Sequence, residues 1–352
     1  MKNIKNLYQH GGNIHEIKRR RQTPVLDFSA NINPLGIPPR IKKLLSKQLK
    51  DLVHYPDPEA HCLVAALARY WKVKEKNVLT GNGSTELIYL IFNAFRPATT
   101  ALPVPSFTEY ERAARISKSK VRFIRLAADE DFRIDSRKVK SCDMFFLCNP
   151  NNPTGNLIVN NRADIENIPA KRIVIDEAFM DYVHNEQAHT FITQATQSKK
   201  FIVIRTLTKF FALPGLRVGY VIAHEDNIRV FKRYQMPWSV NVLAQLAGEN
   251  VLTEDAFMRR SKQHVEKERG FLYESLKRIK GLKPYPSVTN FLLIKIEDER
   301  MTSMRFKERL IEKGIFIRDC SNFRGLDTQF VRVAVRSRTE NERLVQLLQE
   351  CV

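Results

Sequence analysis

Three short apolar runs, each followed at once by a polar motif, most constrain the fold of this chain. They are residues 144–148 (MFFLC), 172–175 (RIVI) and 201–204 (FIVI). Each run is rich in β-branched or aromatic side chains, which is typical of strands buried on both faces. Strands alternate with helical stretches between about residues 45 and 235. This alternation predicts an α/β fold whose mostly parallel central sheet is flanked by helices.

The length of 352 residues allows a large domain and a smaller one. We expect an N-terminal arm over residues 1–44 that contributes to the small domain, and a large domain over residues 45–240. A long helix and the rest of an α+β small domain follow over residues 241–352. Strands of this small domain are predicted at residues 290–296, 314–318 and 330–335, from their apolar and β-branched runs.

The formal net charge of +20 raises the question of a nucleic-acid partner. However, the basic residues are scattered along the whole chain, and the only dense run spans residues 18–21. We interpret the excess mainly as a solvated surface, with a second interpretation that the positive field attracts phosphorylated substrates. The sequence therefore predicts no nucleic-acid partner.

No apolar run approaches the length of a membrane span, and the first residues lack the apolar core of a signal peptide. The five cysteines form no CxxC pair and show no metal-ligand spacing, so we expect reduced thiols and no metal site. These observations predict a cytoplasmic protein without a membrane partner.

Residues 206–220 (TLTKFFALPGLRVGY) carry the most specific motif. Lys209 follows the third apolar run, and open α/β sheets bind ligands just past the carboxyl ends of their strands. Hydroxyls of Thr206 and Thr208 on one side, and two phenylalanines on the other, can lower the pKa of the amine and leave it nucleophilic. With the cation of Arg217 nearby, the motif suits a cofactor that carries an aldehyde and a phosphate. A lone lysine of this kind would more often be a solvated loop residue.

Residues 81–86 (GNGSTE) open an apolar helix that spans residues 87–95. Glycines that lead into a helix expose its first amides, and these can bind an anion through Gly83, Ser84 and Thr85. The alternative is that Ser84 simply caps the helix. Spacing alone supports both interpretations equally.

Polar motifs also follow the other two runs. Residues 149–155 (NPNNPTG) form an irregular loop that orients Asn152, because each Asn-Pro step restricts the backbone. Asp176 follows the second run, where a carboxylate can pair with a protonated pyridine nitrogen. The same carboxylate could equally bind a metal or cap a helix.

Five further side chains are candidates for the site, and each also has an ordinary structural explanation. Tyr110 and its neighbour Phe107 can stack on a pyridine ring, although core packing is the usual fate of such aromatics. Tyr55 precedes a proline and is held extended, although sequence alone favours a surface tyrosine. Arg318 and Arg332 stand at strand ends and can clamp a carboxylate or phosphate, although surface arginines are common in so basic a chain.

In this order, the motifs resemble those of aminotransferase-like fold type I pyridoxal-phosphate enzymes over essentially the whole chain. The resemblance implies that Lys209 binds pyridoxal 5'-phosphate covalently and that Asp176 pairs with its ring nitrogen. It also implies that Asn152 bonds the ring oxygen. The cofactor phosphate would be held by Gly83, Ser84, Thr85, Thr206, Thr208 and Arg217, with Tyr110 also at the cofactor. In the family, Tyr55 reaches the phosphate of a neighbouring subunit, which implies a homodimer.

Within the family, the chain is similar to threonine-phosphate decarboxylases of cobamide biosynthesis. The motifs that carry this resemblance are HGGN (10–13), DFSANINPLG (27–36), DEAF (176–179), QMPWSVN (235–241) and RVAVRS (332–337). The resemblance implies a phosphoamino acid substrate contacted by His10, Gly11, Asn31, Asn152, Arg318 and Arg332. Aminotransferases usually have tyrosine in place of Phe179 and commonly glycine in place of Arg336. The alternatives are a histidinol-phosphate-type aminotransferase and a non-enzymatic basic nucleic-acid binder.

Overall fold

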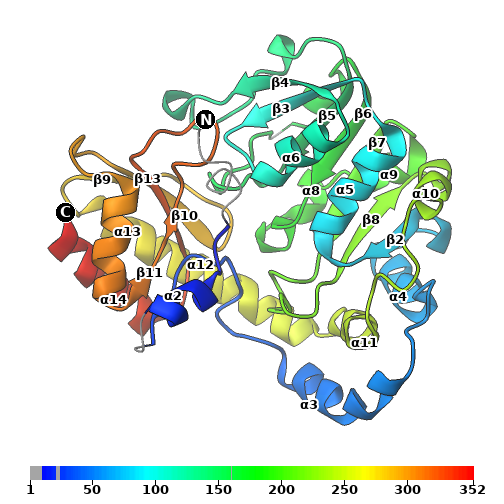
Figure 1. Ribbon diagram of the computed structural model, residues 1–352, viewed down its shortest axis with the longest axis horizontal. Helices are drawn as coiled ribbons and strands as arrows, with labels where there is room; N and C mark the ends of the chain where they lie inside the picture. The colour runs from blue at the N-terminus through cyan, green and yellow to red at the C-terminus, as the bar shows by residue number, and fades with distance from the viewer. Residues whose placement is uncertain (1–9, 21–23, 160) are drawn as a thin grey trace.

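The computed structural model describes residues 10–20, 24–159 and 161–352. Arg21, the last residue of the dense basic run, lies outside them. A seven-stranded sheet forms the centre of the large domain (Figure 1), in the order β2-β8-β7-β6-β5-β3-β4. Its strands are β2 (Val78–Gly81), β3 (Thr99–Val104), β4 (Lys120–Arg125), β5 (Cys142–Cys148), β6 (Ala170–Asp176), β7 (Phe201–Thr206) and β8 (Gly219–Ala223).

Five neighbouring strands of this sheet, from β4 to β7, run parallel to one another. Strand β8 runs antiparallel to both β7 and β2. Parallel neighbours need a crossover, usually a helix, whereas the segment between β7 and β8 forms turns around Lys209 and brings the chain straight back. The predicted mostly parallel sheet is therefore confirmed, with β8 as its exception.

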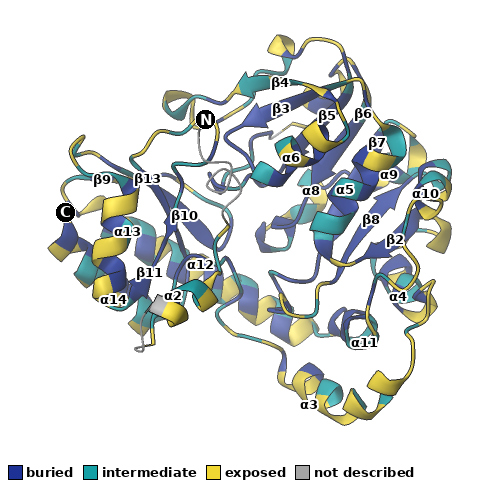
Figure 2. Ribbon diagram, viewed as in Figure 1, coloured by how far each residue is buried: buried dark blue, intermediate teal, exposed yellow. Residues whose placement is uncertain are grey.

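Side chains of successive strand residues point to opposite faces of the sheet. Phe146 and Val174 pack on the side that also holds α5 (Gly83–Phe95) and α6 (Thr108–Ile116). Phe145 and Ile175 pack on the opposite side. That side is covered by α4 (His61–Trp71), α9 (Ile192–Gln197) and α11 (Val242–Val251). Figure 2 shows the resulting buried strands between partly exposed helices.

The small domain is built on an antiparallel sheet in the order β12-β13-β10-β9. These strands are β9 (Leu282–Pro284), β10 (Phe291–Ile296), β12 (Arg318–Asp319) and β13 (Phe330–Ala334). Helices α12 (Asp255–Lys277), α13 (Ser303–Glu312) and α14 (Arg338–Cys351) complete the domain. The N-terminal arm joins it through α2 (Ile14–Arg20) and through β1 (Leu26–Asp27), which pairs with β11 (Ile315–Phe316). The domain boundaries at residues 44 and 240 stay a prediction.

Helix α3 (Pro39–Lys47) follows β1 and leads into the 3-10 helix η1 (Gln48–Val53). Two predicted elements differ in detail from the structure. The helical region after residue 241 is divided by a turn at residues 252–254 into α11 and α12. The strand expected at 314–318 is two short strands, because β11 pairs with β1 and β12 pairs with β13.

The remaining helices are short and connect the strands of the large domain. They are α7 (Arg162–Glu166), α8 (Glu186–His189) and α10 (Glu225–Lys232), with the 3-10 helices η2 (Glu75–Asn77), η3 (Ala128–Glu130), η4 (Ser136–Lys138) and η5 (Met180–Tyr182). Within the described ranges, none of the helices combines the length and the apolar character that crossing a bilayer requires.

Candidate active site

The predicted cofactor residues meet at the carboxyl edge of the large sheet. The register places Asp176, at the end of β6, opposite Cys148 of β5 and Ile204 of β7. Asn152 follows β5, and Lys209 follows β7. Because parallel strands end at one edge, short motifs from separate parts of the sequence converge there.

Asp176 is a buried carboxylate at the end of β6. Its Oδ2 accepts a hydrogen bond from the Tyr110 hydroxyl (2.8 Å), and its Oδ1 accepts one from the Ala178 amide (3.0 Å). Burial raises the pKa of Asp176 to about 6, and these two hydrogen bonds oppose the shift. A desolvated carboxylate of this kind gains from a cationic partner, such as a protonated ring nitrogen.

Tyr110 lies beneath the site and is fully packed. Its ring lies 4.4 Å from that of Phe146 and 5.6 Å from that of Phe107, measured between centroids. Its hydroxyl therefore reaches the site through Asp176, and a direct contact with a cofactor ring stays a prediction. Phe107 is only partly buried and is the aromatic side chain of this pair that remains accessible for stacking.

Lys209 lies in the turn after β7. Its backbone is bound both by the N-terminal arm and by the large domain. Its carbonyl accepts hydrogen bonds from the Asn33 amide (3.1 Å) and from the Tyr182 hydroxyl (3.2 Å). Burial lowers the pKa of the Lys209 amine to about 8, and the cations of Arg332 and Arg217 contribute to the shift. An amine with this pKa is partly neutral near neutral pH and can act as a nucleophile.

The start of α5 has the form of an anion site. The helix begins at Gly83, so Ser84 lies inside it, and the residue before the helix, Asn82, makes no side-chain capping bond. The interpretation of Ser84 as the cap is therefore wrong. The first amides of the helix stay available for an anion.

Hydroxyls and a guanidinium face this helix start. The hydroxyls of Thr206 and Thr208 form a hydrogen bond with 2.9 Å between their oxygens. The Thr206 hydroxyl also donates to the Val218 carbonyl (3.0 Å). The Nη2 of Arg217 donates to the Asn82 carbonyl (3.5 Å), and burial lowers the pKa of Arg217.

Two glycines allow these groups to approach one another. A Cβ on Gly83 would collide with the guanidinium of Arg217, and a Cβ on Gly219 would lie 2.7 Å from the Ser84 amide nitrogen. Gly83 also has a φ of +75°, a conformation that favours glycine. The helix start, β8 and Arg217 therefore form one closely packed cradle.

Two buried arginines from the small domain face the cofactor residues. Arg318 and Arg332 are directly opposite each other in the pairing of β12 with β13, so their side chains leave the same face of the sheet. Because both are buried, the surface-arginine alternative is wrong. Burial lowers the pKa of both guanidinium groups, and that of Arg332 falls to about 10.

The two guanidinium groups have different partners. Arg332 donates to the Asn152 side-chain oxygen and to the Ser29 carbonyl (2.9 Å). Arg318 donates to its neighbouring Asp319 carbonyl (2.6 Å) and to the Asn322 Oδ1 (2.7 Å). Arg332 therefore joins the N-terminal arm to the Asn-Pro loop, whereas these two bonds of Arg318 stay inside the small domain.

The N-terminal arm lies against both domains. The Nε2 of His10 is 2.8 Å from an oxygen of the buried Glu109, and its ring lies 5.2 Å from that of Phe107. Gly11 packs so closely on the Ser29 carbonyl that no side chain would fit. The Oδ1 of buried Asn31 has no hydrogen-bond partner within the described part of the chain and is available to a ligand.

Tyr55 is not part of the site formed by a single chain. Its side chain is 81% exposed and its ring lies tilted against that of Trp238, with 5.1 Å between ring centroids. Its contact with a neighbouring subunit therefore stays a prediction. Among the described residues, no cluster of three or more histidine, cysteine or acidic side chains is arranged to hold a metal.

Several contacts of the site had no signal in the sequence. Glu109 and Ser29 bind residues of the site that are far away along the chain. Phe179 packs edge-on against Phe291, with 5.0 Å between centroids. Arg336 donates to the Asp27 carbonyl (3.0 Å) and pairs with Glu340 (2.6 Å), so this departure from the aminotransferase pattern fastens β1 to α14.

Comparisons with known proteins agree with this arrangement. A threonine-phosphate decarboxylase from Salmonella typhimurium is 37% identical, over 96% of this chain and 95% of the relative. A histidinol-phosphate aminotransferase from Methanocaldococcus jannaschii is 32% identical, over 98% and 95%. The crystal structure of L-threonine-O-3-phosphate decarboxylase from Porphyromonas gingivalis superposes with a TM-score of 0.82 at 28% identity, over 92% of this chain and 98% of that one. Residues 23–348 match the family model of aminotransferase class I and II. The chain therefore belongs to the class I and II aminotransferase family of fold type I enzymes, whose cofactor is pyridoxal 5'-phosphate.

Proposed function

We propose that this protein decarboxylates O-phospho-L-threonine to (R)-1-amino-2-propanol O-phosphate, a linker for the nucleotide loop of cobamides. O-phospho-L-serine, which would give ethanolamine O-phosphate, is the near variant. The observation that carries the proposal is the pair of buried arginines at positions 318 and 332, opposite each other in the small-domain sheet, with Arg332 close enough to Lys209 to lower the pKa of its amine. Two adjacent cations suit a substrate that carries a carboxylate and a phosphate at once. The similarity to threonine-phosphate decarboxylases supports the same substrate class.

The cofactor residues fit pyridoxal 5'-phosphate by their chemistry. When bound, this cofactor supplies an electron sink for the bond that breaks at the Cα of an amino acid. Lys209 offers a partly neutral amine for the aldehyde, and Asp176 offers a buried negative charge for the ring nitrogen. The amides of α5, the hydroxyls of Thr206 and Thr208, and Arg217 form the cradle for its phosphate.

For the substrate, we assign Arg332 to the carboxylate, and Arg318 with the N-terminal arm to the phosphate. Arg332 already binds two oxygen acceptors, Asn152 and the Ser29 carbonyl, so a carboxylate can take the place of either. His10, Gly11 and Asn31 lie on the arm, where they can bind the remaining polar groups. Each charge-assisted hydrogen bond to a buried anion contributes about 1.5–3 kcal/mol.

The orientation of the carboxylate decides which reaction occurs. Lys209 and Asp176 would hold the cofactor, which would supply the electron sink, while Arg332 would set the direction of the bond between Cα and the carboxylate. In the proposed reaction, Arg332 would present this bond for cleavage in place of the Cα–H bond, and carbon dioxide would leave. Lys209, as the neighbouring amine, can return a proton to the same carbon and release the product.

A histidinol-phosphate-type aminotransferase is the second candidate, because proteins with that name are nearly as similar in sequence. The products distinguish the two reactions. Purified protein is incubated with carboxyl-labelled phosphothreonine, and separately with histidinol phosphate and 2-oxoglutarate. Labelled carbon dioxide with the amino alcohol phosphate supports the proposal. Glutamate formation without carbon dioxide release supports the aminotransferase.

We further infer that the active form is a two-fold homodimer in which Tyr55 completes the phosphate site of the partner. Exposed apolar side chains close to Tyr55 along the chain, or close along the chain to its ring partner Trp238, support this inference. They are Leu49, Leu52, Val53 and Met236. Exposed apolar side chains of this kind are typical of a protein interface.

A further inference from the structure

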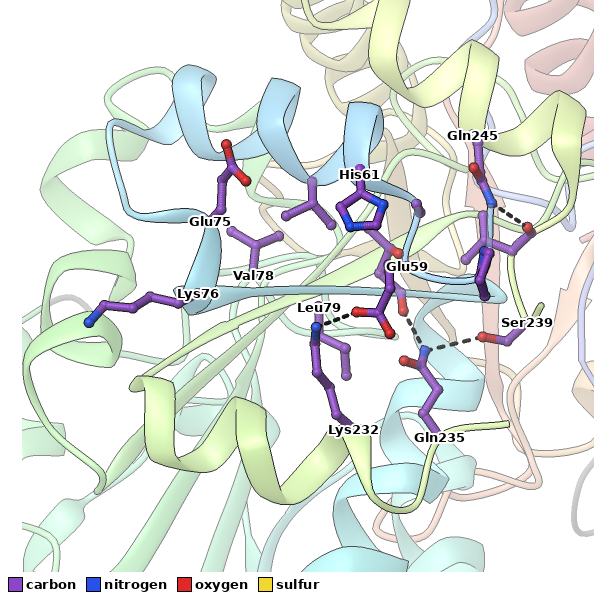
Figure 3. A pocket seen from close by; sticks show the side chains of 15 residues that line it. Glu59, His61, Glu75, Lys76, Val78, Leu79, Lys232, Gln235, Ser239 and Gln245 are labelled. Atoms are coloured by element: carbon purple, nitrogen blue, oxygen red, sulfur yellow. Dashed lines mark hydrogen bonds and ion pairs between the residues drawn. The ribbon is translucent and has the colours of Figure 1, made fainter. Parts of the chain in front are cut away.

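A pocket of about 170 Å³ lies beside β2 (Figure 3). It is lined by residues of α4, by the start and middle of β2, and by the segment from Lys232 to Gln245. One lining residue is Thr80, which directly precedes Gly81, Asn82 and Gly83. We call residues 81–83 the phosphate loop. The pocket therefore reaches the residue that leads into this loop.

Gln235 holds the entry to the phosphate loop. Its Nε2 donates to the Thr80 carbonyl (2.6 Å) and to the Ser239 hydroxyl (3.1 Å), and both bonds are drawn in Figure 3. An amide nitrogen has two protons, so these two bonds use its full donor capacity. The side chain is only partly exposed, and its position is thus fixed by two acceptors in the pocket wall.

Glu86 holds the middle of the same loop. Its Oε2 accepts a hydrogen bond from the Asn82 amide, and a Cβ on Gly81 would lie 2.9 Å from this oxygen. The carboxylate therefore lies directly over Gly81. It satisfies the amide that precedes the helix, which leaves the amides of Gly83 to Thr85 for an anion.

Ser239 lies beside Gln235 and helps to fix its side chain, because the Ser239 hydroxyl oxygen accepts a hydrogen bond from the Gln235 Nε2. Burial raises the pKa of Glu86, and the Asn82 amide and the Ser239 side chain oppose that shift. The loop is therefore held at two points, by Gln235 at the Thr80 carbonyl and by Glu86 at the Asn82 amide.

We propose that Gln235, Ser239 and Glu86 are positioning residues that hold the phosphate loop in the conformation that binds the cofactor phosphate. None of them needs to touch the cofactor. Amides at a helix start bind an anion only when their N–H groups converge. The bonds to the Thr80 carbonyl and to the Asn82 amide fix the backbone on either side of Gly81. The inference rests on the proposed phosphate cradle but is independent of which reaction the enzyme catalyses.

The test compares two cofactor forms that differ only in the phosphate. The dissociation constants of pyridoxal 5'-phosphate and of pyridoxal are measured by absorbance titration of cofactor-free protein. Gln235→Ala, Ser239→Ala and Glu86→Ala are each expected to weaken pyridoxal 5'-phosphate binding about tenfold, the effect of one lost hydrogen bond to a charged group. Pyridoxal binding should change by less than about twofold, because pyridoxal has no phosphate to place.

Two further variants serve as controls. Gln245→Ala removes a glutamine from the same pocket wall whose bonds go to the Asp57 and Val240 carbonyls (2.8 and 2.9 Å), outside the phosphate loop, and it should leave both constants unchanged. Glu86→Gln keeps an acceptor for the Asn82 amide and should bind the phosphate form at least as tightly as wild type.

Several results would overturn the proposal. They are equal weakening of both cofactor forms, equal weakening by Gln245→Ala, or a Glu86→Gln variant as weak as Glu86→Ala. Should Glu86→Ala fail to fold by circular dichroism, the Ser239→Ala comparison decides alone. A wild-type protein that binds the cofactor but releases no carbon dioxide would contradict the proposed reaction and leave this inference intact.

Discussion

The two halves of the active site are built in different ways. The cofactor half lies at one edge of the seven-stranded sheet, where each side chain follows its own strand within a few residues. The half that we propose for the substrate is assembled from the N-terminal arm, the small-domain sheet and the Asn-Pro loop. The residues proposed for the cofactor are therefore encoded in local motifs, whereas those proposed for the substrate depend on how distant segments meet.

The two halves also differ in what their charged groups bind within the protein. Burial shifts the pKa of Lys209 and Asp176 toward values that suit reaction with a cofactor. Arg318 and Arg332 instead bind protein oxygens, which the proposed substrate would have to displace. We therefore expect substitutions in the cofactor half to abolish turnover and substitutions in the substrate half to reduce it by degrees.

The largest effect is expected at Lys209. Lys209→Ala should abolish turnover and leave the fold intact, because only a primary amine can bind the cofactor aldehyde and later release the product. Lys209→Arg should be equally inactive, since a guanidinium stays protonated. Borohydride reduction of the wild type followed by peptide mapping should label Lys209, and a label on any other lysine rejects the assignment.

The pH dependence of cofactor capture tests how the two halves interact. Burial, Arg332 and Arg217 lower the pKa of Lys209 to about 8, so its neutral fraction falls about tenfold per pH unit well below that value. The rate of binding to cofactor-free protein, followed by stopped-flow absorbance, should rise with pH and level off near pH 8. Arg332→Ala removes one cation, so the pH at which the binding rate levels off should increase. A rate that rises until pH 10 would show an unperturbed lysine.

A smaller effect is expected at Arg318. Arg318→Ala should lower kcat/KM for phosphothreonine and phosphoserine on the order of tenfold or more, by loss of a charge-assisted bond. Deletion through Asn13 should have a similar cost, because it removes the arm residues His10 and Gly11. Unphosphorylated threonine is the control substrate, since it lacks the phosphate already. Equal losses for all three substrates would mean that Arg318 is structural or binds the carboxylate.

The smallest effect is expected at Tyr55. Tyr55→Phe removes one hydroxyl and should weaken cofactor binding about fivefold, the effect of one ordinary hydrogen bond, by titration of the dimer. Sedimentation should show a dimer for both proteins. A wild type that is active as a monomer, or an unchanged affinity of the variant, would contradict the shared site.

The sequence predicts the convergence of the proposed cofactor residues for a physical reason. Lys209, Asp176 and Asn152 each follow a buried apolar run, and strand ends in a parallel sheet converge without further information. The substrate half contains contacts over long sequence separations, such as His10 with Glu109 and Arg332 with Asn152. No local pattern encodes such pairs, because tertiary packing forms them.

Two features of the large domain also depend on tertiary packing that local sequence patterns do not encode. The reversed direction of β8 follows from the way the chain turns around Lys209, and periodicity does not report strand direction. The aromatic pair at Phe107 and Tyr110 was predictable as a pair. Only the packing of Tyr110 on Phe146 and its bond to Asp176 distinguish the accessible ring from the buried one.

We propose that the substrate half directs pyridoxal 5'-phosphate chemistry toward decarboxylation. The most direct measurement is the product formed by wild-type protein from carboxyl-labelled O-phospho-L-threonine in the presence of pyridoxal 5'-phosphate. We expect labelled carbon dioxide and 1-amino-2-propanol O-phosphate in equal amounts, with no need for an oxo acid acceptor. An oxo acid product that appears only when 2-oxoglutarate is added, with the label retained, would contradict it.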